Sequence, residues 1–172
     1  MCCSARHIEE SKRVNSQTVM YEAEGKRIQE LCEELTREAN AKVVSFVDKD
    51  GQLLASAGAT SDLDTTGLAS LAAGAIAATG GIAKLINEEE FSQTFHEGER
   101  DNLYLSVIGD RGILVVIFDS RTNLGLVRLR VRKKTQELKN IMEQLSTQAA
   151  TDTGFSQFAE ITDEDIDSLF AN

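Results

Sequence analysis

DTTGLASLAAGAIAATGGIAKLIN, residues 64–87, has the pattern of a long helix with two different faces. Its larger apolar side chains recur at the helical period and are expected to face the core: Leu68, Leu71, Ala75, Ile82 and Ile86. About half a turn away lies a stripe that is almost bare of side chain: Ser70, Ala73, Ala77, Gly81 and Lys84. Asp64 suits the N-cap of this helix and Asn87 suits its end.

The glycines inside this helix have an energetic cost. Gly74, Gly80 and Gly81 each lower helix stability by roughly 1 kcal/mol relative to alanine, or about 3 kcal/mol together. Close approach of another backbone is the usual reason for such a bare face. The alternative is that the residues lie flat on the protein's own sheet, but then the opposite stripe would be free to be long and charged. The sequence therefore predicts a helix that serves as a contact surface.

Composition limits the class of protein. The chain of 172 residues is 41% hydrophobic, which is enough for one domain with tails, and it lacks Trp, so the core should be aliphatic. A net charge of −10 argues against nucleic acid or an anionic membrane as the main partner. We expect no membrane-spanning run and no signal peptide. Three cysteines without disulfide or zinc spacing fit a reducing cytoplasm.

The remaining elements follow from periodicity and turn residues. Helices are expected over residues 21–40 and from residue 122 or 123 to 145, and strands over 41–48, 52–57, 91–97, 102–108 and 113–118. Val127, Leu129 and Val131 alternate as in a strand, but the longer pattern favours a helix. The hairpin connections predict an α+β fold in the order α-β-β-α-β-β-β-α. Its five-stranded antiparallel sheet would carry the middle helix on one face and the outer two on the other.

Both ends of the chain are expected to lie outside the domain. Residues 1–18 are interpreted as an arm, 19–145 as the domain, 146–160 as a linker and 161–172 as a short helix. Thr162 suits the N-cap of that helix, and one apolar face is formed by Ile166, Leu169 and Phe170. So short a helix is unstable alone. It is therefore interpreted as a docking motif, with packing on its own domain as the alternative.

Catalytic groups do not come together in the sequence. His7 and His96 are the only histidines, and Gly80-Gly81 lies inside a helical pattern instead of a phosphate-binding loop. Asp48 and Asp50 are more simply turn formers than metal ligands. We therefore expect a protein that acts by contact, is not itself an enzyme, and needs neither cofactor nor metal.

Several segments together resemble the roadblock / dynein light chain superfamily. They are VVSFVDKDGQLLASAG, residues 64–87, FHEG and LVVIFDSRTNLGLVRLRVRKK, and the tail FAEITDEDIDSLF extends the resemblance to the bacterial members that regulate a small Ras-like GTPase of the MglA type. Residues 1–18 match nothing in that pattern, and a chain without proline makes the linker atypical.

The resemblance implies a cytoplasmic homodimer whose central helices pair and whose sheet edges join. On that basis the dimer interface is assigned to Ser70, Ala73, Ala77, Phe91 and Phe95. The resemblance also implies that two chains bind one GTP-loaded GTPase and activate hydrolysis without an arginine finger. GTP and Mg would be bound by the GTPase, and the role would lie in cell polarity and gliding motility, with recruitment to a cell pole.

The GTPase-facing surface is assigned, within this resemblance, to Ala73, Ala77, Gly80, Gly81, Lys84 and Lys133. The tail helix, through Ile166, Leu169 and Phe170, is expected to make a second contact that promotes nucleotide exchange. The alternative function is a dimeric scaffold or adaptor of a motor or polarity complex without catalytic stimulation. Phosphate release from a cognate GTPase distinguishes these two functions.

Overall fold

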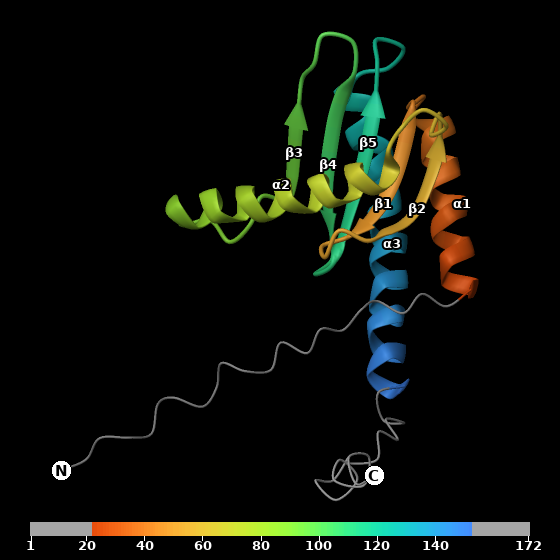
Figure 1. Ribbon diagram of the computed structural model, residues 1–172, viewed down its shortest axis with the longest axis vertical. Helices are drawn as coiled ribbons and strands as arrows, with labels where there is room; N and C mark the ends of the chain where they lie inside the picture. The colour runs from red at the N-terminus through yellow and green to blue at the C-terminus, as the bar shows by residue number, and fades with distance from the viewer. Residues whose placement is uncertain (1–21, 153–172) are drawn as a thin grey trace, which may run out of the picture.

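The computed structural model describes residues 22–152 and places them in a sheet covered by helices on both faces (Figure 1). The elements are α1 Glu22–Glu38, β1 Val43–Asp48, β2 Leu53–Gly58, α2 Thr65–Leu85, β3 Gln93–His96, β4 Asn102–Ile108, β5 Gly112–Phe118 and α3 Leu124–Asp152. The five strands are paired antiparallel in the order β2-β1-β5-β4-β3. Both the element order and the fold class predicted from the sequence are confirmed.

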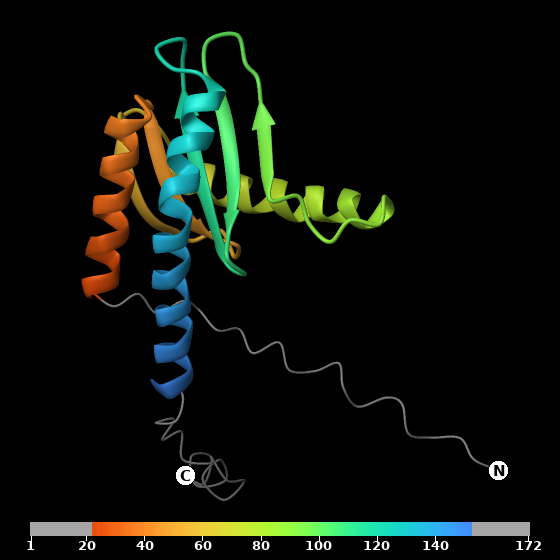
Figure 2. The same cartoon turned by 180° about the vertical axis from the view of Figure 1, so that it is seen from behind.

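The sheet separates two apolar clusters. On one face α1 and α3 lie side by side (Figure 2) and bury an aliphatic core with Phe46, Tyr104 and Phe118. On the other face α2 packs against β1, β2 and β5 and covers a smaller cluster around Val47, Leu105 and Val115. The apolar strand β5 is the middle strand and is covered on both sides, as its continuous hydrophobic run predicts.

The inward face of α2 is rotated by about a quarter turn from the one expected. Ala69, Ala72, Ala73, Ile76 and Ala83 are buried against the sheet. Three of the large residues assigned to the core are exposed instead, and Leu85 joins them: Leu71 by 75%, Ile82 by 53%, Leu85 by 84% and Ile86 by 58%. Leu68 and Ala75 are partly buried, as expected. Small side chains allow a helix axis to lie close to the strands, so size and not hydrophobicity decides which face is inside.

The ends of α2 are where the sequence places them. The Asp64 side chain accepts a hydrogen bond from the backbone N–H of Gly67 at 2.9 Å, which makes it the N-cap. Asn87 adopts a positive φ of 63°, and the N–H of Glu88 donates to the carbonyl of Ala83 at 2.9 Å. Many helices end in this way, with a residue in the left-handed conformation followed by an N–H that donates to a carbonyl of the last turn.

The third helix is longer than expected. Its N-cap is Asn123, whose Oδ1 accepts from the N–H of Leu126 at 3.0 Å, and the alternating segment around Leu129 is helical. The helix continues to Asp152, so residues 146–152 belong to it and not to the expected linker. Neither glycine nor proline occurs between Gly125 and Gly154, which explains the continuation. The arm at 1–18 and the docking helix at 161–172 lie outside the described residues.

The two edges of the sheet differ. At the β2 edge, the side-chain amide of Gln29 donates to the carbonyl of Ser56 at 3.0 Å and accepts from its N–H at 3.3 Å. This pair imitates a neighbouring strand and, with α1 beside it, closes the β2 edge. At the other edge β3 is paired only with β4 among the described residues. The structure therefore presents one exposed strand edge, at β3.

Candidate protein-binding surface

A groove runs along the C-terminal half of α2. Its cavity measures about 310 Å³ and its walls come from α2, the β1–β2 turn and the loop that leads to β3. The lining residues are Lys49, Ala73, Ile76, Ala77, Gly80, Gly81, Lys84, Glu89 and Glu90. The floor is apolar and nearly flat, and charged side chains stand around it. Lys49 Nζ lies 2.7 Å from Glu90 Oε1, an ion pair that joins two walls of the groove.

The β1–β2 turn is held in place from the neighbouring turn. The Arg111 guanidinium lies 2.7 Å from Asp50 Oδ2 and 3.2 Å from Asp48 Oδ1, and the Asp48 side chain is buried. The N–H of Lys49 donates to the carbonyl of Arg111 at 2.7 Å. Arg111 thus fixes the turn that carries Lys49 to the groove.

Three glycines of α2 have no explanation within the protomer. A Cβ added to Gly74, Gly80 or Gly81 would meet nothing within 4 Å. By contrast, a Cβ on Gly51 would come 3.3 Å from the Cα of Ser70. Ser70 and Ala73 therefore lie close to the protein's own hairpin. Gly74, Gly80 and Gly81 face open space, where an outside molecule can approach the helix backbone.

The exposed large residues of α2 form a second surface, which we call the apolar ridge: Leu71, Ile82, Leu85 and Ile86. By length and composition α2 is long and apolar enough to cross a membrane, contrary to the expectation from sequence. The most apolar 18 residues of α2 have a mean hydropathy of 1.5, and 28% of them are buried in the protein. Full burial of a large apolar side chain contributes roughly 1.5–3 kcal/mol of free energy relative to leaving it in water. An apolar ridge of this size is typical of a surface that another molecule covers.

Residues 27–118, from α1 to the end of β5, match the model of the Roadblock/LC7 domain family, which is more than half of the chain. The chain belongs to the Roadblock/LC7 family. The resemblance noted from the sequence is thereby confirmed.

Solved MglB structures are similar to this Roadblock/LC7 chain. Myxococcus xanthus MglB is 59% identical with a TM-score of 0.70, over 74% of this chain and 96% of that one. The gliding protein MglB of Thermus thermophilus is 35% identical with a TM-score of 0.70, over 74% of this chain and 97% of that one. Uncharacterized protein MJ1340 of Methanocaldococcus jannaschii is 31% identical over 106 residues, which are 62% of this chain and 91% of that protein.

The Roadblock/LC7 fold brings together five of the six residues assigned to the GTPase-facing surface. Ala73, Ala77, Gly80, Gly81 and Lys84 all line the groove, although Ala73 is only 8% exposed and belongs to its floor. Lys133 does not join them, because it lies on α3, which covers the opposite face of the sheet from α2 (Figures 1 and 2). Three further residues line the groove without any signal in the sequence, because only the fold brings their loops to α2: Lys49, Glu89 and Glu90.

The residues assigned to the dimer interface are dispersed. Ser70 is exposed on α2 beside the hairpin, whereas Ala73 is buried against the sheet. Phe91 lies just before β3 and is partly exposed. Phe95 packs on Phe118 with ring centroids 6.2 Å apart, toward the cluster under α1 and α3. The apolar ridge was not assigned to the interface, because three of its residues, Leu71, Ile82 and Ile86, were expected to face the core.

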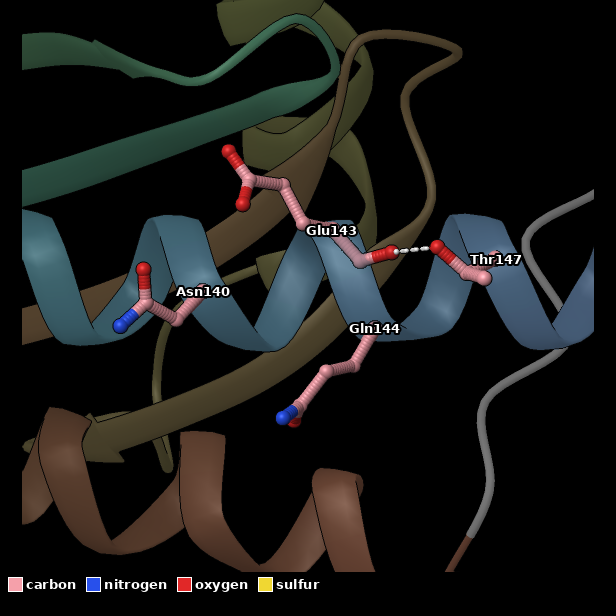
Figure 3. A pocket seen from close by; sticks show the side chains of 4 residues that line it. All are labelled: Asn140, Glu143, Gln144 and Thr147. Carbon is pink, nitrogen blue, oxygen red and sulfur yellow. Dashed lines mark hydrogen bonds between the residues drawn. The ribbon is translucent and has the colours of Figure 1, made fainter.

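A second hollow, of about 480 Å³, lies on α3 and is lined by Asn140, Glu143, Gln144 and Thr147 (Figure 3). The Thr147 hydroxyl donates to the carbonyl of Glu143 at 2.8 Å, an ordinary contact along one helix. Elsewhere, burial raises the pKa of the Cys32 thiol to about 12, so this cysteine is not a nucleophile at neutral pH. Within residues 22–152, no three His, Cys, Asp or Glu side chains are grouped to hold a metal ion.

Proposed function

We propose that this protein is an MglB-type regulator, a homodimer that binds a small Ras-like GTPase of the MglA type and stimulates its GTP hydrolysis. The observation that carries this proposal is that α2 has two uncovered sides, the apolar ridge and the small-residue groove. The 59% identity to Myxococcus xanthus MglB supports the same interpretation. One side suits a second copy of the chain, and the other suits the GTPase.

The dimer would form across the apolar ridge and the β3 edge. The four large side chains are 53–84% exposed, so covering them represents roughly 4–8 kcal/mol of burial free energy in each protomer before the costs of association. The exposed strand β3 offers backbone groups for pairing with its twin. Burial of the ridge and pairing of the edge would join two sheets into one.

The GTPase would lie on the groove. A bare helix face admits another backbone closely at Gly80 and Gly81, and charged side chains on the walls provide orientation and electrostatic steering. No arginine lines the groove among the described residues, and Arg130 is paired with Glu38 beside α1 at 3.4 Å. Stimulation would therefore come from repositioning the GTPase's own catalytic residues by contact with its switch regions.

The test is the rate of phosphate release from a purified MglA-type GTPase with and without this protein. Ala77→Arg adds a long charged side chain at an exposed groove position, so stimulation should fall at least about tenfold, or roughly 1.4 kcal/mol. Gln136→Arg is the matched control, since it adds the same charge on α3 and should leave stimulation unchanged.

Full stimulation by the Ala77→Arg protein would exclude the groove as the contact. If the wild-type protein binds the GTPase without accelerating phosphate release, the protein is a scaffold and not an activator. The role of Ile166, Leu169 and Phe170 in exchange stays a proposal, because these residues lie outside the described part. So do the cytoplasmic location and the recruitment to a cell pole.

A further inference from the structure

The side of α3 that faces α1 is electrically balanced. Arg130 of α3 pairs with Glu38 of α1 at 3.4 Å, and Lys134 of α3 pairs with Glu34 of α1. Glu137 in turn accepts from Arg27. Each of these ion pairs joins α1 to α3, so the charges between the two helices are neutralised within the domain.

The outward side of α3 is not balanced. Arg128, Arg132 and Lys133 are exposed, and none of them forms an ion pair with a described residue. Leu129 lies between them on the helix surface and is 51% exposed. Positions three and four apart are neighbours on a helix, so Leu129, Arg132 and Lys133 form one patch, which Arg128 extends toward the N-terminus. We call these four residues the basic face of α3.

The chain that follows α3 has the opposite charge. Residues 153–172 contain five carboxylates and neither lysine nor arginine, so they carry half of the net charge of −10. Three of the carboxylates, Asp163, Asp165 and Asp167, surround the apolar Ile166, and Leu169 and Phe170 follow. An acidic segment with a few large apolar residues complements a basic patch that has a leucine at its centre.

The distances allow this contact within one chain. α3 ends at Asp152, and Lys133 lies 19 residues earlier, or about 29 Å along a helix that rises ~1.5 Å per residue. The nine residues 153–161 span about 30 Å when extended. Thr162 can therefore reach Lys133, and the segment after it can run back toward Arg128. Because the tether belongs to the same chain, docking of the acidic segment should not depend on protein concentration.

We propose that residues 161–170 dock on the basic face of α3 in the same chain. The aspartates pair with Arg128, Arg132 and Lys133, and the apolar residues cover Leu129. This contact does not depend on a GTPase. It gives the tail a resting place in the free protein, from which a partner must displace it.

The test is backbone amide relaxation of the ¹⁵N-labelled full chain. Amides 162–170 should tumble with the domain in the wild-type protein, and Arg132→Glu together with Lys133→Glu should release them to fast local motion. Lys26→Glu with Arg100→Glu is the matched control, because it makes the same charge change at exposed sites outside α3 and should leave the tail docked. About 1 M salt should loosen the wild-type tail, since the Debye length then falls to about 3 Å and the ion pairs are weakened.

Unchanged amide positions of Leu114 and Val116 in β5 would show that each variant is folded. Three results would overturn the proposal: a tail that is already mobile in the wild-type protein, a tail that stays ordered after charge reversal on α3, or docking that disappears on dilution. The last result would mean that the tail is held by another chain.

Discussion

Cys32 shows how burial of a single side chain couples the fold to pH. It lies on the inward face of α1 and is fully buried, so the charged thiolate form is disfavoured in the folded protein. Burial raises its pKa from 9.0 to about 12. The unfolded chain therefore loses this proton at lower pH than the folded chain, and alkali favours unfolding.

We accordingly predict that the thiol's contribution to stability is complete below pH 9 and is lost as pH rises from 9 toward 12. The free energy of unfolding should fall by up to about 1.4 kcal/mol per pH unit from this group. Urea unfolding at about pH 8 and about pH 10.5 measures the slope. Cys32→Ala should show a shallower slope, because it lacks the thiol. Burial also raises the pKa of Tyr104, but it does so in both proteins and leaves the difference between them unchanged. Equal slopes would contradict this assignment.

At the scale of the element, α2 carries the features that distinguish this chain. Its glycines at positions 74, 80 and 81 face open space, so alanine can be placed there without a clash. Gly80 and Gly81 line the groove, whereas Gly74 does not. Substitutions at these positions therefore distinguish an effect on helix stability, expected at all three, from an effect on partner binding, expected only at Gly80 and Gly81.

We predict that Gly81→Ala raises the free energy of unfolding by about 1 kcal/mol, because alanine is the better helix former. The same variant should weaken stimulation of the GTPase, since its methyl group occupies the closest approach. Gly74→Ala should stabilise equally and leave stimulation intact. Urea unfolding and phosphate release measure the two effects. Equal effects of both substitutions on stimulation would contradict the role given to the groove.

The boundaries of the elements, except the C-terminal end of α3, could be predicted from sequence, because caps, turns and periodicity are local. Asp64, Asn87 and Asn123 mark helix ends in the sequence and in the structure. The inward face of α2 could not, because the helix is apolar on both sides. Hydrophobicity ranks Leu85 above Ala73, yet closeness to the strands requires the smaller residue inside. Lys49 and Glu90 reach the groove only through the fold.

For the whole molecule, the apolar ridge determines the expected assembly. Leu85 is 84% exposed, so replacing it should not disturb the folded protomer. We predict that the wild-type protein sediments as a dimer and Leu85→Glu as a monomer, because a carboxylate at the proposed interface would be buried without a partner. Sedimentation equilibrium measures the mass. Leu129→Glu, at another exposed leucine, is the control and should stay dimeric. A dimeric Leu85→Glu protein would exclude the ridge as the interface.

The amide of Gln29 on the backbone of Ser56 has a consequence for how large such an assembly becomes. Strand-to-strand growth needs two free borders on every unit, one to receive a neighbour and one to offer to the next. Here the β2 edge is already contacted by a side chain of the same molecule, so pairing through β3 occupies the remaining edge of the sheet. In the proposed dimer, addition of strands would end after a single step, and the product would be a closed pair instead of a fibre.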